Sequence, residues 1–216
     1  MDRRDWRGFA GVCGFVAPVS VLGAIFLATV LASPETFTWR GRALSHMGHY
    51  ETRTFWLFNG GLIVGGVIGL PFTWRLWIDG QDVFERLGIV VLVVSLVGMI
   101  GVGIFFLGHP AYYLSVGLHN HAAVTYFVAA PFAQWIYGTG SIRTGRITLG
   151  LASIWLGIVH SLAWVSWLLY RSVAPDPMAW FAVPEFLAAL SFGIWIVVLA
   201  TDVRRRERRS TARGQS

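Results

Sequence analysis

The amino-acid sequence predicts an all-α, polytopic integral membrane protein: a six-helix bundle with both termini in the cytoplasm. Three observations lead to this prediction. The 216 residues are 55% hydrophobic and only 13% charged, whereas charged residues make up about 25% of a typical soluble domain. Apolar runs of about twenty residues recur along the chain, and each is long enough to cross a hydrocarbon core of about 30 Å. The arginines gather on alternate connections between these runs.

Six apolar runs are found when charged residues, prolines and glycines are taken as boundaries. Helices are the elements that fit these lengths, because strands of a membrane barrel would be about half as long and would alternate in polarity. The predicted spans cover residues 9–32, 54–77, 87–108, 118–138, 147–170 and 180–201, and a basic cytoplasmic tail covers 202–216. We therefore expect a single multi-pass domain, 1–216, in the cell membrane, with the lipid bilayer as its main partner.

The distribution of arginine orients the predicted bundle. All 17 basic residues are arginine, and thirteen of them fall on the side that holds both predicted termini. The opposite side holds Arg40, Arg42, Arg53 and Arg171. Because cytoplasmic connections carry the excess of basic residues, this asymmetry places both termini in the cytoplasm.

A cluster of basic residues follows the last predicted span. It consists of Arg204, Arg205, Arg206, Arg208 and Arg209. Each of these arginines could add on the order of 1 kcal/mol of attraction to anionic lipid near the membrane surface. Membrane topology thus accounts for the net charge of +6, and no nucleic-acid partner is expected.

Histidine is the most informative polar residue. Five of the six histidines are predicted on the outer side: His46, His49, His109, His119 and His121. His160 lies about ten residues inside its span, which corresponds to a depth of roughly 15 Å. An ionisable group at that depth usually faces the bundle interior or a wet cavity. His160 shares a helical stripe with Ser153, Gly157, Trp164 and Trp167, so we expect it to face other helices.

The polar residues of the outer side suggest two kinds of site. A ligand-binding cavity would be lined by Ser45, Asn59, His119, His160 and Glu185. A metal site would use His46, His49, His119, His121 and His160, because imidazole binds zinc, copper, nickel and iron. The spacing matches no specific metal motif. Structural roles are also open: Ser45 as the cap of the second helix, and Glu185 as a first-turn acid paired with an outer arginine or histidine.

Short motifs follow one another in a recognisable order. Ser45-His46-Met47-Gly48 follows the first span, and Phe58-Asn59-Gly60 opens the second. Gly103-Ile104-Phe105-Phe106 ends the third span ahead of His109-Pro110, and His119 opens the fourth. In this order the motifs resemble the domain of unknown function 998 family and, more remotely, the Frag/DRAM group. The resemblance implies a six-helix integral membrane protein without a settled activity.

Two function hypotheses from different classes stay open, and the sequence does not separate a binding protein from an enzyme. The leading one is a nonenzymatic membrane protein that binds or senses a lipid or small ligand at a polar outer-face cavity. The alternative is a metal-dependent, membrane-embedded lipid hydrolase or transferase, in which outer-face histidines hold a metal that lowers the pKa of bound water. Proton-coupled transport through His160 is less favoured, because the other spans lack midplane acids and no inverted repeat is visible.

Overall fold

The computed structural model describes residues 3–111, 113–176 and 178–213. Within these residues the chain forms six long α-helices and two short helical segments. The α-helices are α1 (Arg3–Leu31), α2 (Phe55–Asp79), α3 (Val83–Ile104), α4 (His119–Arg143), α5 (Ile147–Arg171) and α6 (Ala182–Arg213). A 3-10 segment, η1 (Leu44–Gly48), precedes α2, and a π-helical segment, η2 (Tyr113–Leu118), precedes α4.

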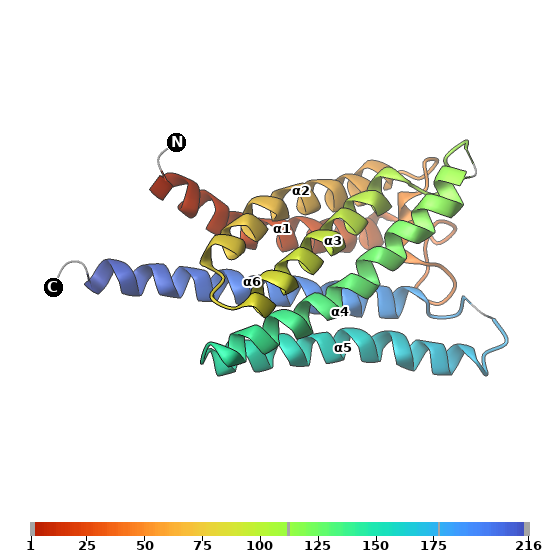
Figure 1. The fold of residues 1–216 in the computed structure, drawn as a ribbon. Helices are drawn as coiled ribbons and strands as arrows, with labels where there is room; N and C mark the ends of the chain where they lie inside the picture. The colour runs from red at the N-terminus through yellow and green to blue at the C-terminus, as the bar shows by residue number, and fades with distance from the viewer. Residues whose placement is uncertain (1–2, 112, 177, 214–216) are drawn as a thin grey trace.

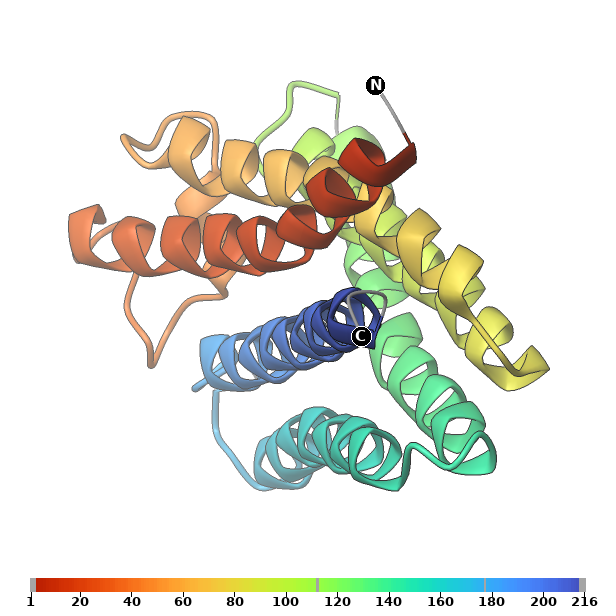
Figure 2. The same cartoon turned by 90° about the vertical axis from the view of Figure 1, so that its left-hand side faces the viewer.

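The two ends of the bundle differ in the segments that they carry. Both termini and the short α2–α3 and α4–α5 connections lie at one end, which we call the terminal end (Figure 1). The opposite end, which we call the loop end, carries η1, η2 and the α5–α6 connection. Seen from the terminal end, α6 lies between α1, α4 and α5 (Figure 2). The central position of α6 lets residues at either of its ends contact several other helices.

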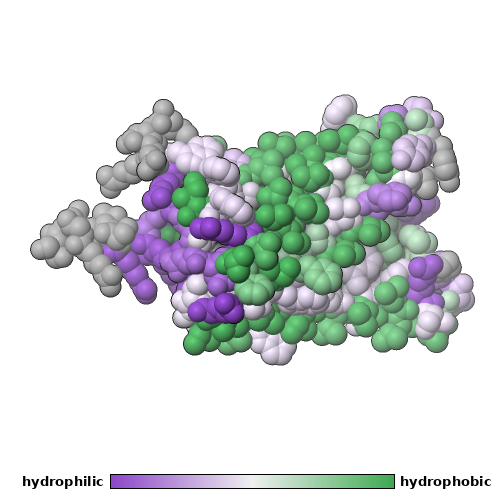
Figure 3. All heavy atoms as spheres, viewed as in Figure 1, coloured by the Kyte–Doolittle hydropathy of each residue, from purple (hydrophilic) through white to green (hydrophobic). Residues whose placement is uncertain are grey.

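Five of the described helices are long and apolar enough to cross a membrane, namely α1, α2, α3, α5 and α6. Hydrophobic side chains form a band around the middle of the molecule, and hydrophilic ones gather at the two ends (Figure 3). Helix α4 has 25 residues but is less apolar, because it carries polar residues such as His119, Gln134 and Ser141. All three of these side chains are buried inside the bundle. The structure is therefore that of a multi-pass helical membrane protein, and its orientation in the membrane stays a prediction.

The helix bounds differ from the predicted spans mainly at the terminal end. Helix α3 begins at Val83, ahead of the predicted residue 87, because the Asp82 carboxylate caps it by accepting a hydrogen bond of 2.8 Å from the Phe84 N–H. Helix α6 continues to Arg213, so its last turns carry the arginines that were expected in a separate tail. Capping and helix continuation beyond the membrane leave no signal in hydropathy, which explains both differences.

Small residues set how closely the helices pack. A Cβ atom added at Gly98 of α3 would lie 2.6 Å from the backbone nitrogen of Tyr126 in α4, and one at Gly88 would lie 2.6 Å from that of Tyr137. A Cβ atom at Gly61 of α2 would collide with Ala24 of α1. Lipid provides no hydrophobic force between helices, so such close approaches supply the dispersion contacts that hold them together.

Helices α4 and α5 are close at the terminal end and diverge toward the loop end (Figure 1). A Cβ atom at Gly138 would lie 2.8 Å from the Gly150 carbonyl oxygen, so the two glycines allow backbone contact at the closed side. Farther along, the larger Trp135 side chain occupies the space beside Gly157. The divergence opens space between α4 and α5 in the half of the bundle nearest the loop end.

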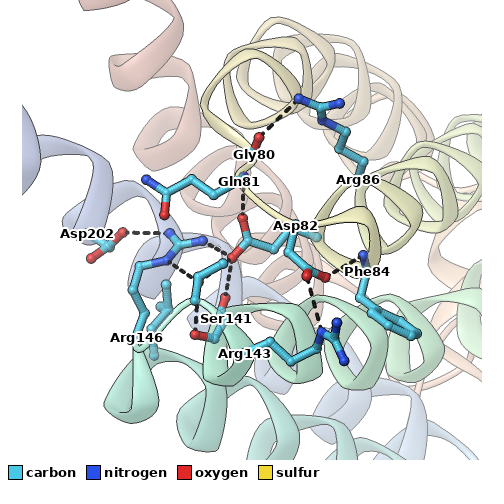
Figure 4. A network of polar contacts seen from close by, with 12 residues as sticks. Gly80, Gln81, Asp82, Phe84, Arg86, Ser141, Arg143, Arg146 and Asp202 are labelled. Carbon is cyan, nitrogen blue, oxygen red and sulfur yellow. Dashed lines mark hydrogen bonds and ion pairs between the residues drawn. The ribbon is translucent and has the colours of Figure 1, made fainter.

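The terminal end is held by a network of ionic side chains. Glu85 of α3 is fully buried and pairs with Arg146, which also lies 3.4 Å from Asp202 of α6. Arg143 bonds to Asp82 at 3.1 Å, so the network joins α3, α4 and α6 to the start of α5 (Figure 4). The Phe84 N–H, followed by Arg143, holds the pKa of the Asp82 carboxyl below its usual range.

A second ionic cluster lies at the same end. Arg75 of α2 is buried and donates hydrogen bonds to Asp79 at 2.8 Å, to Glu207 at 2.7 Å and to the Arg7 carbonyl oxygen at 3.0 Å. It thereby ties α1 and α2 to the last turns of α6. The two clusters together connect all six helices at the terminal end.

Candidate functional site

A groove of about 880 Å³ lies between α4 and α5, where the two helices diverge. Its volume falls within the range of about 300–1,000 Å³ that is typical of ligand sites. The edges of its mouth are exposed apolar side chains: Val124, Val128 and Phe132 on α4, and Val165 and Leu168 on α5. These side chains lie along the outer faces of α4 and α5, so the groove opens on the side of the bundle, between the two helices.

The inner wall of the groove is largely aromatic. Phe127 of α4 packs edge-on against Trp164 of α5 with ring centroids 4.9 Å apart. Trp164 packs in turn against Phe181, which precedes α6, at 5.5 Å. Trp135 lines the end of the groove nearest the terminal end. Rings of this kind offer apolar contact to an alkyl chain and negative faces to a cation.

Polar residues gather at the part of the groove nearest the loop end. Four of the five residues predicted for a ligand cavity line it: Ser45, His119, His160 and Glu185. Ser45 lies within η1, whose N-cap residue is Ala43, and α2 begins only after Thr54. The interpretation of Ser45 as the cap of the second helix is therefore wrong.

Asn59 does not line the groove. Its Nδ2 atom donates hydrogen bonds to the carbonyl oxygens of Gly48 at 2.8 Å and Phe55 at 3.0 Å. A Cβ atom at Gly48 would lie 2.5 Å from Asn59 Oδ1, so the glycine is needed for this approach. Asn59 thus fixes η1 against α2 and supports the groove indirectly, through the position of Ser45.

Glu185 is the acidic residue of the groove. It lies in the first turn of α6 and is 7% exposed. Its Oε2 atom accepts a hydrogen bond of 2.6 Å from the Leu44 N–H, while Oε1 has no hydrogen bond or ion pair within the part of the chain that the structure describes. An outer arginine or histidine was expected as its partner, and a backbone N–H of η1 takes that place instead. Glu185 is therefore a buried acid without a cation beside it.

Hydrogen bonds assign the tautomers of the two histidines that line the inner part of the groove. His119 Nδ1 lies 2.8 Å from the Phe105 carbonyl oxygen. A carbonyl oxygen only accepts, so Nδ1 carries the proton and Nε2 of the neutral ring carries a lone pair. His160 Nε2 lies 3.0 Å from the Phe127 carbonyl oxygen, so by the same reasoning Nδ1 carries the lone pair. His160 Nδ1 has no hydrogen-bond partner among the described residues.

His160 is fully buried and bonds from α5 to α4, so the prediction that it faces other helices is confirmed. His46 lines the groove at its loop end, where its Nδ1 accepts a hydrogen bond of 3.1 Å from the Ala43 N–H. Burial, and next the positive charge of Arg42, lowers the pKa of His46 below its usual value. His46 is therefore neutral at pH 7.

The five histidines considered as metal ligands are not brought together. His46, His119 and His160 line the groove. His49 instead stacks on Tyr50 with ring centroids 5.1 Å apart, and the exposed His121 donates to the Gly117 carbonyl oxygen at 2.6 Å. Over residues 3–111, 113–176 and 178–213, no three histidine, cysteine, aspartate or glutamate side chains are arranged to hold a metal ion.

Sequence reasoning missed the aromatic wall. The signal was present as a four-residue spacing on α4, where Ala123, Phe127, Pro131 and Trp135 all line the groove. A stripe at that spacing marks one face of a helix, but aromatic residues in a membrane helix equally suit lipid contact. The distinction depends on where α5 lies, which the stripe does not reveal.

Four of the motifs noted in the sequence meet around the loop end. Asn59 bonds to Gly48, His119 bonds to Phe105, and a Cβ atom at Gly103 would lie 2.7 Å from the Asn59 carbonyl oxygen. The motifs therefore form one structural unit that places η1 and His119 beside the groove.

Comparisons with known proteins agree with this architecture. No match is found among curated proteins or among solved structures. The remote resemblance to the Frag/DRAM group stays a prediction. The model of one family, described as a protein of unknown function (DUF998), matches residues 4–202, which include almost all of the six helices. The chain therefore belongs to the DUF998 family.

Proposed function

We propose that this protein binds or senses a lipid or related amphiphile in the groove between α4 and α5. The observation that carries the proposal is the combination of a sideways opening between α4 and α5 with the largely buried Glu185 at the polar end, whose printed hydrogen bond uses Oε2 and leaves Oε1 to the groove. The alkyl chain of the ligand would lie along the aromatic wall. Its head would reach Ser45, His119 and Glu185.

The chemistry of the groove fits an amphiphile better than a soluble polar ligand. Ligand sites are mostly apolar with a few polar groups that fix orientation, and this groove has its polar groups at one end. Burying Glu185 without a partner costs free energy, and a ligand head that bonds to it removes that cost. The head of the bound amphiphile would thus supply the hydrogen bond that Glu185 does not receive from the protein.

The orientation of the chain adds the side of the membrane to this proposal. Thirteen of the 17 arginines belong to the side that carries the termini, which favours a cytoplasmic terminal end. The groove's polar end would then lie in the outer leaflet. In the same orientation, the exposed Arg204, Arg205, Arg208 and Arg209 of α6 would contact anionic lipid of the inner leaflet, while Arg206 forms an ion pair with Asp202, with Nε and Oδ2 2.9 Å apart.

The alternative of a metal-dependent lipid hydrolase or transferase lacks a supporting observation. A catalytic zinc needs about three protein ligands around one point. Within the described residues no such group occurs. The binding hypothesis is therefore the one that the geometry favours.

Filling the groove tests the proposal. Ala123 lines the groove, and Ala123→Phe would occupy the space of a bound chain. The control is Val97→Phe, which adds a ring to an exposed position of α3 outside the groove. Both variants are purified, exchanged against vesicles of mixed phosphatidylethanolamine and phosphatidylglycerol, and examined for retained lipid by native mass spectrometry.

We expect retained lipid to be lost from Ala123→Phe and kept by the Val97→Phe control. His119→Ala should also lose lipid, because it removes one polar contact of the head. Thermal unfolding of each variant checks that the fold is intact. Equal retention by wild type, Ala123→Phe and His119→Ala would show that the groove binds no lipid.

A further inference from the structure

Three hydrogen-bond acceptors lie at the polar end of the groove, beyond the Trp164 Nε1–H donor of the aromatic wall, which has no partner among the described residues. No hydrogen bond to Glu185 Oε1 is found among the described residues, His160 Nδ1 is enclosed without a partner, and His119 Nε2 carries the lone pair of its ring. A carboxylate is acceptor-only, and a neutral imidazole offers one acceptor once its N–H is used. These atoms belong to three different helices, α4, α5 and α6. A ligand that satisfies them must bring hydrogen-bond donors.

The charge of the groove points in the same direction. Glu185 is its acidic residue, and no arginine is found among the described residues that line it. A buried carboxyl without an opposite charge beside it is held in its neutral form, and an ammonium placed beside it favours the carboxylate and forms an ion pair with it. An anionic head, such as a carboxylate or sulfate, would instead place a like charge next to Glu185. The groove therefore suits a cationic head and disfavours an anionic one.

The aromatic wall adds a second feature that suits a cation. Phe127, Trp164 and Phe181 line the groove in consecutive edge-on contacts. Aromatic faces attract cations, and tryptophan attracts them most strongly. Lateral access from the bilayer requires that the cation be attached to an alkyl chain.

Two classes of cationic head differ in their donors. A primary ammonium has three N–H donors, as in lysine, whereas a quaternary ammonium has none and could use only the aromatic faces. Only the primary ammonium satisfies both the charge of Glu185 and the unpaired acceptors. Building on the proposed function, we propose that the groove recognises an amphiphile with a primary ammonium head, which donates to Glu185 Oε1 and to His119 Nε2.

A chain-matched series tests this inference on the wild-type protein. The probes are dodecylamine, dodecyltrimethylammonium, dodecanol and dodecanoate, added at neutral pH to the protein in neutral detergent micelles, with binding followed by tryptophan fluorescence. We expect dodecylamine to bind about tenfold more tightly than each of the other three, a difference of about 1.4 kcal/mol. Ethylamine tests the head without a chain, and phosphatidylethanolamine tests the same head on a phospholipid.

A variant then assigns the preference to one residue. In Glu185→Gln the amide oxygen still accepts from the Leu44 N–H, but the negative charge is gone. Dodecylamine binding should weaken about tenfold while dodecanol binding stays unchanged. The matched control is Glu51→Gln, which removes an exposed acid at the loop end and should leave both affinities as they are. The wild-type series keeps the inference testable even if Glu185→Gln fails to fold.

The outcomes separate this inference from the proposed function. If all four dodecyl probes bind equally and Ala123→Phe abolishes their binding, the groove binds amphiphiles but the ammonium preference is overturned. Equal affinity for dodecylamine and dodecyltrimethylammonium overturns the role of the N–H donors. Equal affinity for dodecylamine and ethylamine overturns the need for a chain. If Ala123→Phe changes no binding, the proposed function falls together with the inference.

Discussion

Glu85 at the terminal end and Glu185 at the loop end are both buried carboxylates, 0% and 7% exposed, near the first turns of their helices. Glu85 pairs with Arg146 and also accepts hydrogen bonds from Thr144 at 3.1 Å and from the Gln81 N–H at 2.9 Å. Glu185 accepts one bond, from the Leu44 N–H. The two acids are buried to a similar extent, but Glu85 has more hydrogen-bond and ion-pair partners than Glu185.

The difference separates a structural role from a binding role. A buried ion pair holds its partners in one geometry, because removing either partner leaves an uncompensated charge. At the terminal end this pairing fixes four helices where Gly138 and Gly150 bring α4 and α5 together. At the loop end the same two helices diverge, and the acid faces a groove. The acid that lacks a cation thus lies where a ligand can enter.

Breaking the buried pair should have the largest effect on stability. Arg146→Ala leaves Glu85 without its cation and should lower the free energy of unfolding by about 3–5 kcal/mol. Glu185→Gln, at the other end, should leave stability unchanged or raise it, because the acid has no cation to lose. Thermal and denaturant unfolding in micelles, followed by circular dichroism, measure both variants.

The double variant Glu85→Gln with Arg146→Ala serves as the control for this comparison. It removes the stranded charge and should recover much of the loss caused by Arg146→Ala alone. Equal destabilisation by Arg146→Ala and Glu185→Gln would mean that both acids are structural, and the contrast between the two ends would be lost.

A crowded glycine gives a smaller effect at the terminal end. A Cβ atom at Gly140 of α4 would lie 2.5 Å from the backbone nitrogen of Glu85. Backbone cannot rotate away as a side chain can, so Gly140→Ala should push α3 and α4 apart and cost about 1–3 kcal/mol. The control is Gly23→Ala in α1, where nothing lies within 4 Å of the added Cβ atom.

The measurement is again the unfolding midpoint, combined with lipid retention. Gly140→Ala should lower the midpoint and keep its lipid, since the groove lies in the other half of the bundle. If Gly140→Ala lost as much lipid as Ala123→Phe, the two ends of the bundle would be coupled. The terminal end would then influence ligand binding as well as stability.

The sequence was sufficient to predict the helices and part of the groove. Length and hydropathy locate all six helices to within a few residues at most boundaries, because a membrane span must be long and apolar. The helical stripe correctly predicts that His160 faces other helices, and the polar residues selected with it include His119 and Glu185, both of which line the groove. These inferences depend on distance along a helix, which the chain alone determines.

The features that the sequence did not predict depend on how the helices cross. The groove exists because α4 and α5 meet at Gly138 and Gly150 and then diverge, and glycines in other helices look the same in sequence. Glu85 resembles an ordinary first-turn acid until Arg146, 61 positions later, is placed beside it. Asn59 is a polar residue of the kind that lines ligand-binding sites, but its side chain donates a hydrogen bond to the Gly48 carbonyl oxygen instead. Pairings of this kind are tertiary, and periodicity carries no information about them.

The smallest predicted effect is the pH dependence of the loop end. Burial and the charge of Arg42 lower the pKa of His46 in the folded protein, so the unfolded chain binds a proton more readily. The stability associated with neutral His46 is therefore fully present above the unfolded pKa of about 6.5 and is lost as the pH falls through the lower folded pKa. The unfolding midpoint should decline in this acid range.

Glutamine at position 46 isolates the contribution of this histidine. His46→Gln cannot be protonated, so the acid-dependent decline of the midpoint should become shallower than in wild type, while the midpoint above the unfolded pKa should change little. His49 and His119 are the other histidines near His46, and any dependence that persists in His46→Gln comes from groups other than His46. In the same range, a protonated His46 would repel a cationic head, so dodecylamine should bind less tightly to wild type and lose less affinity in His46→Gln. Identical pH profiles for the two proteins would show that the charge of His46 affects neither stability nor binding at the polar end of the groove. Glu185 would then be the group that distinguishes the loop end from the paired acids of the terminal end.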